Sequence, residues 1–361
     1  MTTPAKTLEK SLNLGYHFQD MNFSWSQIKK PVVALAPMSG VSDIAMRVMA
    51  KKFGSDLLFS EFISAASIFY KTENEKSFKL AEFLPEERPY FIQLFGNEPE
   101  HFKAAAKILA EKFHPDGFDI NFGCPARSVV NSGAGSALFC EPQKAAEIIK
   151  IVKEYSGGLP TSIKLRAAFK NISVLEFIEK IKDALFENVT LHMRSYEQMH
   201  TGAPNWDAAK ALGEKLKTFD RPISFIINGG LDSAKKAKEA LEYTGADGVM
   251  IAQASLGNPF IFREIKAAFN NQPIPVTTPQ ERIETALEHA RLMLQTKGEH
   301  YGITEMRKHL AWYFKGFPGV SELRGQLVKI NSLPELEAIL CQLDPSALSQ
   351  STANQPAKTS A

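Results

Sequence analysis

The sequence predicts an α/β fold, a (βα)8 TIM barrel, followed by a small C-terminal domain that is an all-helical bundle. Between residues 31 and about 253, a short apolar strand-like segment followed by an amphipathic helix-like segment recurs eight times. After residue 253 only helix-like segments follow. A doubly wound open sheet is the main alternative, but it usually has fewer strands, and no GxGxxG sequence follows the first strand.

The eight strand-like segments are short and apolar, and turn-forming residues bound most of them. They cover residues 31–38, 57–64, 90–96, 117–123, 161–166, 188–193, 222–229 and 245–253. Clear amphipathic helix patterns separate most of them, for example at 98–113, 142–155 and 233–243. This alternation, over a length typical of the fold, favours a closed barrel.

The chain is expected to have four parts. Residues 1–30 form an N-terminal lead-in, for which a hairpin that closes the barrel floor is one interpretation, and residues 31–269 form the barrel. Helix patterns at 279–296, 304–314, 320–330 and 333–343 predict a helical domain over 279–343, joined to the barrel by the polar, Pro-containing residues 270–278. Residues 344–361, rich in Ser, Thr, Ala, Gln and Pro, are expected to be a disordered tail.

Composition limits the possible functions. A content of 44% hydrophobic residues in 361 is enough for a sizeable core, and a net charge of +2 argues against a uniformly basic surface but permits a local one. No apolar run is long enough to span a membrane, and the N-terminus lacks the apolar stretch of a signal peptide. Three cysteines without CxxC spacing predict neither a disulfide framework nor a zinc site. We expect a cytoplasmic monomer with no membrane partner and no metal.

Polar or glycine residues lie at the predicted carboxyl end of every strand, where barrel enzymes hold their active sites. Burying charged groups among apolar strands is costly without partners. A single such residue is more often a satisfied core or rim group, but eight aligned sets favour a functional site. In chain order these residues are Pro37, Met38 and Ser39; Glu61; Gln93; Asn121 and Cys124; Lys164 and Arg166; His192 and Arg194; Asn228, Gly229 and Gly230; and Ala252 and Gln253.

Two glycine-containing turns follow predicted strands seven and eight, where barrels commonly bind phosphate through backbone N–H groups. They are residues 228–230 (NGG) and 255–258 (SLGN). Gln93, Lys164 and His192 could then hold a planar heterocycle above the barrel mouth. A cationic lysine near the pyrimidine edge of a flavin favours the reduced, anionic form.

The three cysteines differ in context. Cys124 lies between Gly and Pro at a strand-to-loop corner, which favours a thiol exposed to the site that acts as a proton donor or nucleophile. Cys140 and Cys341 lie in helix-like or apolar contexts, where we expect buried, inert side chains. The nearby segment 133–136 (GAGS) suggests a mobile loop that could close over a substrate.

Two motifs stand out around the predicted strand ends, residues 36–43 (APMSGVSD) and residues 119–125 (DINFGCP). They resemble the signature APMAGVTD and the catalytic-cysteine motif of the tRNA-dihydrouridine synthase family. The resemblance runs from about residue 31 to about residue 343, and the combination is more specific than any fragment. Further matches are 162–166 (SIKLR), 191–194 (LHMR), 244–251 (TGADGVMI), 257–262 (GNPFIF) and, in the helical domain, 307–313 (RKHLAWY).

The resemblance implies an FMN-dependent oxidoreductase that uses NADPH or NADH to reduce uridines in tRNA to dihydrouridine. It also implies that the hydride goes to carbon 6 of the uracil and that Cys124 gives a proton to carbon 5. The uracil must be flipped out of the RNA stack, because a stacked base cannot reach the site. By position, the implied cofactor contacts are Pro37, Met38, Ser39, Gln93, Lys164, His192, Asn228, Gly229, Gly230, Ala252 and Gln253. The expected substrate contacts are Asn121, Arg127, Arg166, Arg194 and, in the helical domain, Arg307, Lys308 and Arg324.

The chain departs from the family pattern at four places. The usual HGR is HMR at 192–194, NGD is NGG at 228–230, and GR after the last strand is Ala252-Gln253. The last change removes a cation expected near the FMN phosphate, so we expect weaker flavin binding. The family's GCPxKK becomes GCPARS at 123–128, which loses one basic residue near the RNA path.

Three alternatives remain open at this point. One is a phosphate-binding aldolase with Lys164 as a Schiff-base lysine, which would need neither flavin nor Cys124. Another is a flavin barrel that reduces a free pyrimidine, as dihydroorotate dehydrogenases do, although a free base needs no second domain. The third is a degenerate tRNA-binding homologue, against which the intact Cys124, Lys164 and His192 argue.

Overall fold

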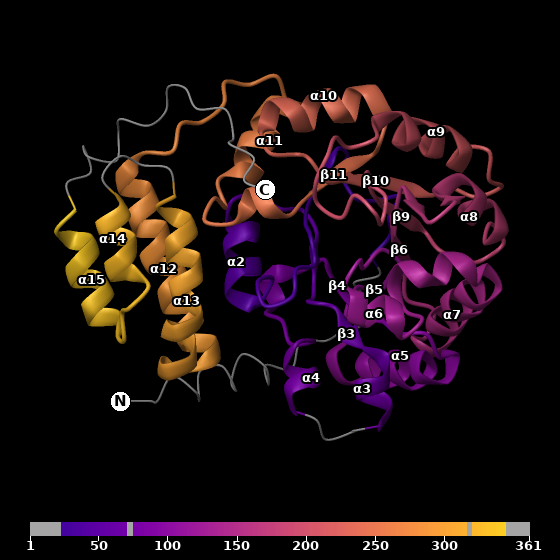
Figure 1. Cartoon of the computed structure of the whole chain (residues 1–361), viewed down its shortest axis with the longest axis horizontal. Helices are drawn as coiled ribbons and strands as arrows, with labels where there is room; N and C mark the ends of the chain where they lie inside the picture. The colour runs from indigo at the N-terminus through magenta and orange to yellow at the C-terminus, as the bar shows by residue number, and fades with distance from the viewer. Residues whose placement is uncertain (1–22, 71–74, 316–319, 344–361) are drawn as a thin grey trace. The chain divides into compact units, whose positions relative to one another are not determined.

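The structure is a computed structural model that describes residues 23–70, 75–315 and 320–343. These residues fall into two compact units, which we describe separately (Figure 1). The first contains residues 23–254 and 261–273, and the second contains residues 255–260 and 274–343. The short segment 255–260 therefore belongs with the C-terminal helices, although the last strand of the barrel ends shortly before it, at Ile251.

The first unit is a parallel barrel. Its strands are β1 Val32–Leu35, β2 Leu58–Phe59 with β3 Ile63–Ser64, β4 Tyr90–Phe95, β5 Gly117–Asn121, β6 Thr161–Arg166, β9 Asn188–His192, β10 Ser224–Asn228 and β11 Gly248–Ile251. They run in the order β1-β11-β10-β9-β6-β5-β4-β2, with β3 also beside β4, and a bridge between Ala34 and Leu57 closes the ring. The predicted (βα)8 barrel is confirmed, and each strand lies inside the segment predicted for it.

Helices surround these strands (Figure 1). They are α2 Ile44–Lys52, α3 Ala65–Tyr70, α4 Glu75–Lys79, α5 Pro99–Phe113, α6 Arg127–Asn131, α7 Pro142–Tyr155, α8 Val174–Lys180, α9 Trp206–Leu216, α10 Ala234–Thr244 and α11 Ile261–Phe269, with 3-10 turns η1 Pro85–Glu87, η2 Gly135–Cys140 and η3 Gln253–Ser255. Polar N-caps begin several of them: Asp43 accepts from the backbone N–H of Met46, and Ser233 from that of Lys236.

Some short elements were not predicted from the sequence. These are α3, α4 and α6 and the two-stranded hairpin β7 Ala168–Phe169 with β8 Ile172–Ser173. Each has at most six residues, which is too short for a helical or alternating pattern to be recognised. The hairpin follows β6 directly, and so lies at the carboxyl end of the barrel.

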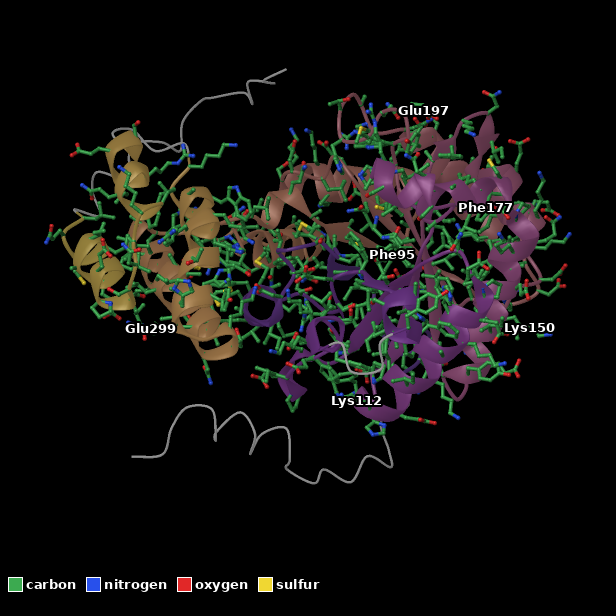
Figure 2. The ribbon with its side chains drawn as sticks, turned by 60° about the horizontal axis from the view of Figure 1, so that its bottom comes forward. Phe95, Lys112, Lys150, Phe177, Glu197 and Glu299 are labelled. Atoms are coloured by element: carbon green, nitrogen blue, oxygen red, sulfur yellow. The ribbon has the colours of Figure 1, made fainter. Side chains whose placement is uncertain are left out.

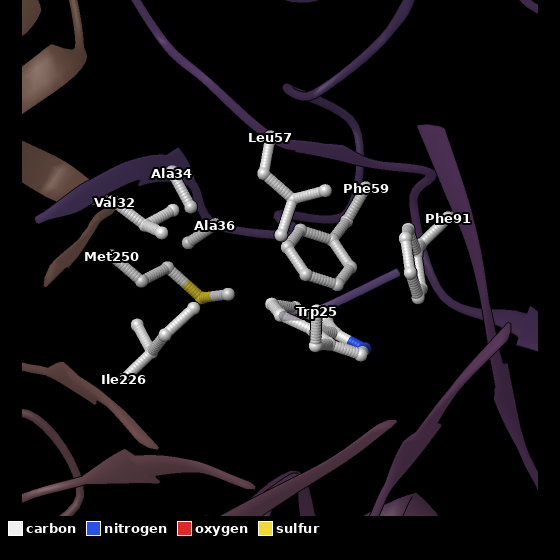
Figure 3. Close-up of a cluster of buried hydrophobic side chains, with 9 residues drawn as sticks. All are labelled: Trp25, Val32, Ala34, Ala36, Leu57, Phe59, Phe91, Ile226 and Met250. Atoms are coloured by element: carbon white, nitrogen blue, oxygen red, sulfur yellow. The ribbon is translucent and has the colours of Figure 1, made fainter. Parts of the chain in front are cut away.

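The barrel interior has an apolar part and a polar part. The register pairs Met250 with Asn228 and Asn228 with His192, so these three side chains lie on the same face of the sheet. Trp25, 6% exposed, enters from the lead-in and packs against inward-facing apolar residues (Figure 3). These residues are Val32, Ala34, Ala36, Leu57, Phe59, Phe91, Ile226 and Met250. Strands β5, β6 and β9 place polar side chains on this inward face, and these build the site.

The second unit is helical, with α12 Pro279–Lys297, α13 Glu299–Tyr313, α14 Val320–Leu327 and α15 Leu333–Cys341. The four predicted helices are present, but α13 begins five residues before its predicted start at 304. Gly302 lies inside α13, and a Cβ there would come within 2.7 Å of the carbonyl oxygen of Met293 on α12. An internal glycine weakens the helical pattern in the sequence, yet here it permits close contact between the two helices.

Parts of the termini lie outside the described residues. Of the lead-in, residues 23–30 form turns and contain no strand, and the rest of the predicted hairpin falls on residues 1–22, outside the described region. The predicted tail, 344–361, also falls outside it. No helix among the residues described is long and apolar enough to cross a membrane.

Candidate active site

The turn after β1 is held in one conformation by buried polar groups. The carbonyl oxygen of Met38 accepts from the N–H groups of Val41 and Ser42 and from the Ser42 hydroxyl, which in turn accepts from the N–H of Met38 at 2.8 Å. A carboxylate oxygen of Glu61 accepts from the N–H of Gly40, whose φ is +69°. Pro37 and Met38 are half-buried and Ser39 is exposed, so this fixed turn can offer a surface to a ligand.

Buried polar side chains from neighbouring strands are joined by hydrogen bonds across the barrel. The Nε2 amide of Gln93 donates to Asp119 at 2.6 Å, and the hydroxyl of Ser162 donates to the other oxygen of Asp119 at 2.5 Å. The Nδ2 amide of Asn121 donates to Oε1 of Gln93 at 3.0 Å. Burial raises the pKa of Asp119 to about 6, although the Ser162 and Gln93 hydrogen bonds and nearby Lys164 act to lower it.

Lys164 extends from β6 beside this network. Among the described residues, its ammonium group has no hydrogen bond and no ion pair. Burial and the positive charge of Arg166 lower the pKa of Lys164 to about 8, while Asp119 and Cys124 act to raise it. A half-buried cation without a hydrogen-bonding partner is costly, so Lys164 is well suited to bind a polar or anionic ligand.

His192, at the end of β9, is neutral. Burial, Lys164 and Arg166 lower its pKa to about 2. Its Nδ1 accepts from the backbone N–H of Arg194 at 3.3 Å, so the ring proton is on Nε2 and can be donated to a ligand. A Cβ on Gly229 would lie 2.9 Å from this Nε2, which shows how closely the ring approaches that glycine.

The turn after β10 offers backbone N–H groups. Gly229 and Gly230 have φ values of +96° and +75°, and within the described part of the chain neither N–H donates to a protein acceptor. The side chain of Asn228 holds the turn by donating to the carbonyl of Met250 at 2.7 Å. Successive N–H groups in such a turn form a concave anion site. This is the place expected for a phosphate in a TIM barrel.

The residues that follow β11 differ in burial and in their contacts. Ala252 is half-buried, and Gln253 is exposed at the start of η3. Gly257 packs inside the helical unit: a Cβ there would lie 2.2 Å from the backbone carbon of Trp312, and its carbonyl accepts from Arg282 at 3.1 Å. The structure therefore gives Gly257 a packing role, while the phosphate role predicted for its turn stays a prediction.

Cys124 follows β5 and is 9% exposed, packed with Val129, Ala134 and Phe95. Its carbonyl accepts from the N–H and the hydroxyl of Ser136, which is fully buried. The segment 133–136, predicted to be a mobile loop, lies packed against the cysteine in this structure. Phe139, in the 3-10 turn that begins at Gly135, stacks on Phe177 with ring centroids 4.4 Å apart. Phe95 and Phe177 are labelled in Figure 2.

The exposure of the cysteines differs from the prediction. Cys140 and Cys341 are exposed, not buried as expected, and Cys124 is the buried one. Cys140 is the last residue of η2 and Cys341 is the last residue of α15, so both lie where a helix leaves the packed interior. The prediction that Cys140 and Cys341 are buried was wrong because the neighbouring sequence does not show at which turn a helix face reaches solvent.

The three arginines predicted to bind substrate in the barrel have different surroundings. Arg166 is 2% exposed and donates to the carbonyls of Gly123, Ser195 and Met199 at 2.7–2.9 Å, so it fixes the backbone before Cys124. Arg194 is half-buried and donates to the carbonyl of Gly202 at 2.8 Å. Arg127 is exposed at the start of α6.

The cations predicted to bind RNA in the helical unit also differ. Arg307 donates to the carbonyl of Ile330 at 2.9 Å and to Asn331, and so holds the chain after α14. Lys308 lies 3.9 Å from Glu305, an acidic residue three positions earlier on the same helix. Arg324 is exposed on α14, and its side chain has no partner among the described residues.

Several site residues were missed from the sequence alone. Asp119 and Ser162 connect the polar network, and Ser42 holds the turn after β1. Each lies within a motif quoted above for its resemblance. The register of neighbouring strands could have identified Asp119 and Ser162. Asp119 pairs with Gln93 on one adjacent strand and with Ser162 on the other, so all three side chains face the barrel interior.

The comparison that decides the family is the match of residues 34–350 to the model of dihydrouridine synthases (Dus). The chain belongs to the dihydrouridine synthase family. It is 34% identical over 315 residues to a probable tRNA-dihydrouridine synthase 1 of Synechocystis sp., which covers 86% of this chain and 85% of that one. It is 33% identical over 320 residues to a probable tRNA-dihydrouridine synthase of Aquifex aeolicus, covering 88% and 95%. The resemblance in the motifs is thus confirmed.

A solved structure supports the fold of this dihydrouridine synthase family member. A 2-naphthoyl-CoA reductase in complex with 2-naphthoyl-CoA aligns with a TM-score of 0.51 at 11% identity, covering 67% of this chain and 50% of that one. This likeness concerns the barrel fold alone. Within the described ranges, no group of three or more His, Cys, Asp or Glu side chains could hold a metal ion.

Proposed function

We propose that this protein is a tRNA-dihydrouridine synthase, which reduces the carbon 5–carbon 6 double bond of specific uridines in tRNA with FMN as cofactor and NADPH or NADH as reductant. The observation that carries the proposal is the arrangement at the carboxyl ends of the strands. There the ammonium of Lys164 and the N–H groups of Gly229 and Gly230, none of which has a partner among the described residues, lie at the same barrel mouth as the thiol-bearing loop of Cys124. A tRNA substrate agrees with the cytoplasmic location expected from composition.

The residues present fit a flavin mononucleotide. In the turn Asn228-Gly229-Gly230, a Cβ on Gly229 would lie 2.9 Å from His192 and one on Gly230 would lie 2.8 Å from Pro204, so the turn requires glycines, and its N–H groups suit a phosphate. Lys164 would face the polar edge of the ring system and His192 would donate from Nε2. Gln93, which is fully buried in this structure, stays a proposed contact beside them. Pro37, Met38, Ser39, Ala252 and Gln253 remain proposed contacts at the neighbouring turns. Bound FMN would supply the hydride that is added to carbon 6 of the uracil.

The chain's own residues would then position the base and supply the proton. Cys124 is the proposed acid at carbon 5, and Arg166 fixes its loop by binding the carbonyl of Gly123. Asn121 and Arg194 are proposed to contact the uracil and its nucleotide. Exposed Arg127 would bind the RNA backbone, and Arg307, Lys308 and Arg324 are proposed for the tRNA side of the helical unit.

Lys164→Ala is expected to weaken FMN binding about 10- to 100-fold, because a charged hydrogen bond is worth about 1.5–3 kcal/mol. The wild-type pKa of about 8 gives the pH dependence: the ammonium is present below this value, so affinity for FMN falls as pH rises through it. Lys164→Ala should remove that dependence. Quenching of FMN fluorescence between pH 6.5 and 9.5 measures both effects, and a wild-type protein that binds no FMN would refute the proposal.

Arg324→Ala is expected to weaken tRNA binding and to lower the slope of log affinity against log salt by about 0.9, as for the loss of one phosphate contact. FMN affinity should not change. Arg291→Ala is the matched control, since this exposed arginine of the same unit is already paired with Glu337 at 2.7 Å. Filter binding at several salt concentrations tests this. If the salt dependence of tRNA affinity has the same slope in the Arg324 variant as in the wild type, Arg324 makes no contact with the RNA backbone.

A further inference from the structure

Four side chains and one backbone group in the barrel form a chain of hydrogen bonds with a single direction. The N–H of Gly123 donates to Oδ1 of Asn121 at 3.0 Å, Asn121 donates to Gln93 at 3.0 Å, and Gln93 donates to Asp119 at 2.6 Å. Ser162 donates to the second oxygen of Asp119 at 2.5 Å. Every donor therefore points toward the carboxylate, which lies where the chain of donors ends.

The two ends determine this direction. A side-chain amide can turn by 180° and exchange its donor for its acceptor, so Gln93 and Asn121 do not define their own orientation. An ionised carboxylate can only accept, which turns the NH₂ of Gln93 toward Asp119 and its oxygen toward Asn121. A backbone N–H can only donate, which turns the oxygen of Asn121 toward Gly123. Both ends require the same orientation of both amides.

We propose that Asp119 is a positioning residue that orients the amide of Gln93 and, through it, the amide of Asn121, so that Asn121 presents its remaining N–H to ligands at the barrel mouth. This inference rests on the proposed function. Each amide nitrogen has two hydrogens and uses one in the chain. Gln93 is fully buried, whereas Asn121 is 8% exposed, so the second hydrogen of Asn121 is the one that can reach a carbonyl oxygen of the cofactor or of the uracil. If the amide of Asn121 turned, it would present an oxygen to those acceptors, and the contact would become repulsive.

Asp119 also acts through its charge. Its negative charge near Lys164 acts to raise the pKa of that lysine, whereas burial and the positive charge of Arg166 lower it. With Asp119 ionised above about pH 6 and Lys164 protonated below about pH 8, both are charged between these values. Removal of the carboxylate charge should therefore cause Lys164 to lose its proton at a lower pH.

Two substitutions separate orientation from charge. In Asp119→Asn the amide oxygen can still accept from Gln93 while its NH₂ faces Ser162, whose hydroxyl can turn to the carbonyl of Phe118, already 3.3 Å away. Orientation is kept and charge is lost. In Asp119→Ala both the acceptor and the charge are lost, and the N–H of Gly123 is the one fixed end of the chain that remains. Asp116→Asn is the matched control, because Asp116 is a buried carboxylate directly before the same strand, bound to Arg88 and to the N–H of Tyr90.

The experiment is FMN binding by fluorescence quenching, without substrate, from pH 6.5 to 9.5, with thermal unfolding of each variant as a folding check. At pH 6.5 we expect Asp119→Ala to bind about tenfold more weakly than wild type and Asp119→Asn to bind within about threefold of it. In Asp119→Asn the fall in affinity near pH 8 should move to lower pH. Asp116→Asn should follow the wild-type curve.

Two results would overturn the inference. One is equal FMN affinity of Asp119→Ala and Asp119→Asn at pH 6.5, which would show that no acceptor at this position orients the amides. The other is that the fall in FMN affinity of Asp119→Asn occurs at the same pH as in the wild type. Failure of the proposed function looks different, since the wild type itself would then bind no FMN, and the inference would fall with it.

Discussion

Cys124→Ala is expected to slow the oxidation of reduced, FMN-loaded protein by tRNA at least a hundredfold, while its reduction by NADPH stays near the wild-type rate. Addition of a hydride at carbon 6 leaves negative charge that must be neutralised at carbon 5, and a positioned general acid contributes about 10²- to 10⁴-fold. Reduction of the cofactor needs no such proton. Stopped-flow absorbance at the flavin band measures the two steps separately.

The other cysteines provide matched controls for this experiment. Cys140→Ala and Cys341→Ala remove exposed thiols at helix ends and should change neither step. Because Cys124 packs with Val129 and Ala134, unfolding of its variant should be measured alongside. If Cys124→Ala oxidises normally with tRNA, another group is the acid, and His192 or Arg166 would be the next candidate.

Gly257→Ala is expected to lower the free energy of unfolding of the helical unit by about 3 kcal/mol or more. The new Cβ would lie 2.2 Å from the backbone carbon of Trp312 and 2.3 Å from the nitrogen of Tyr313, and backbone atoms cannot move aside as a flexible side chain can. The left-handed conformation, with φ of +63°, adds about 1–2 kcal/mol for any residue with a Cβ. Denaturant or calorimetric unfolding measures the change.

Gly245→Ala separates steric overlap from backbone conformation. Gly245 has nearly the same φ, +64°, but a Cβ there would meet nothing within 4 Å, so only about 1–2 kcal/mol should be lost. The experiment also distinguishes two roles for Gly257. Unchanged stability together with weakened FMN binding would show that Gly257 serves the phosphate and not the packing of the helices.

The fold could be predicted because its signals are local and periodic. Each barrel strand is a short apolar segment, and the long helices α5, α7, α10 and α12 have faces that repeat every three to four residues. All of them formed within a few residues of the predicted bounds. The small elements α3, α6 and β7–β8 are too short for such a signal, so they were missed.

The sequence by itself determined which polar residues lie in the carboxyl-terminal parts of the barrel strands. Strand ends are defined by local pattern, and closure of a parallel barrel brings all of its carboxyl ends together. Gln93, Lys164, His192 and Asn228 could therefore be selected without coordinates. The motifs that contain Cys124, Lys164 and His192 also indicated the family.

Only the tertiary structure decided what these residues contact. The partners of Asp119 are 26 and 43 residues away along the chain, and those of Arg166 are 29 to 43 residues away. Such contacts depend on the register between strands and on loop paths, which no local pattern contains. For the same reason, exposure of Cys140, burial of Cys124 and the packing of Gly257 against α13 were decided by long-range packing.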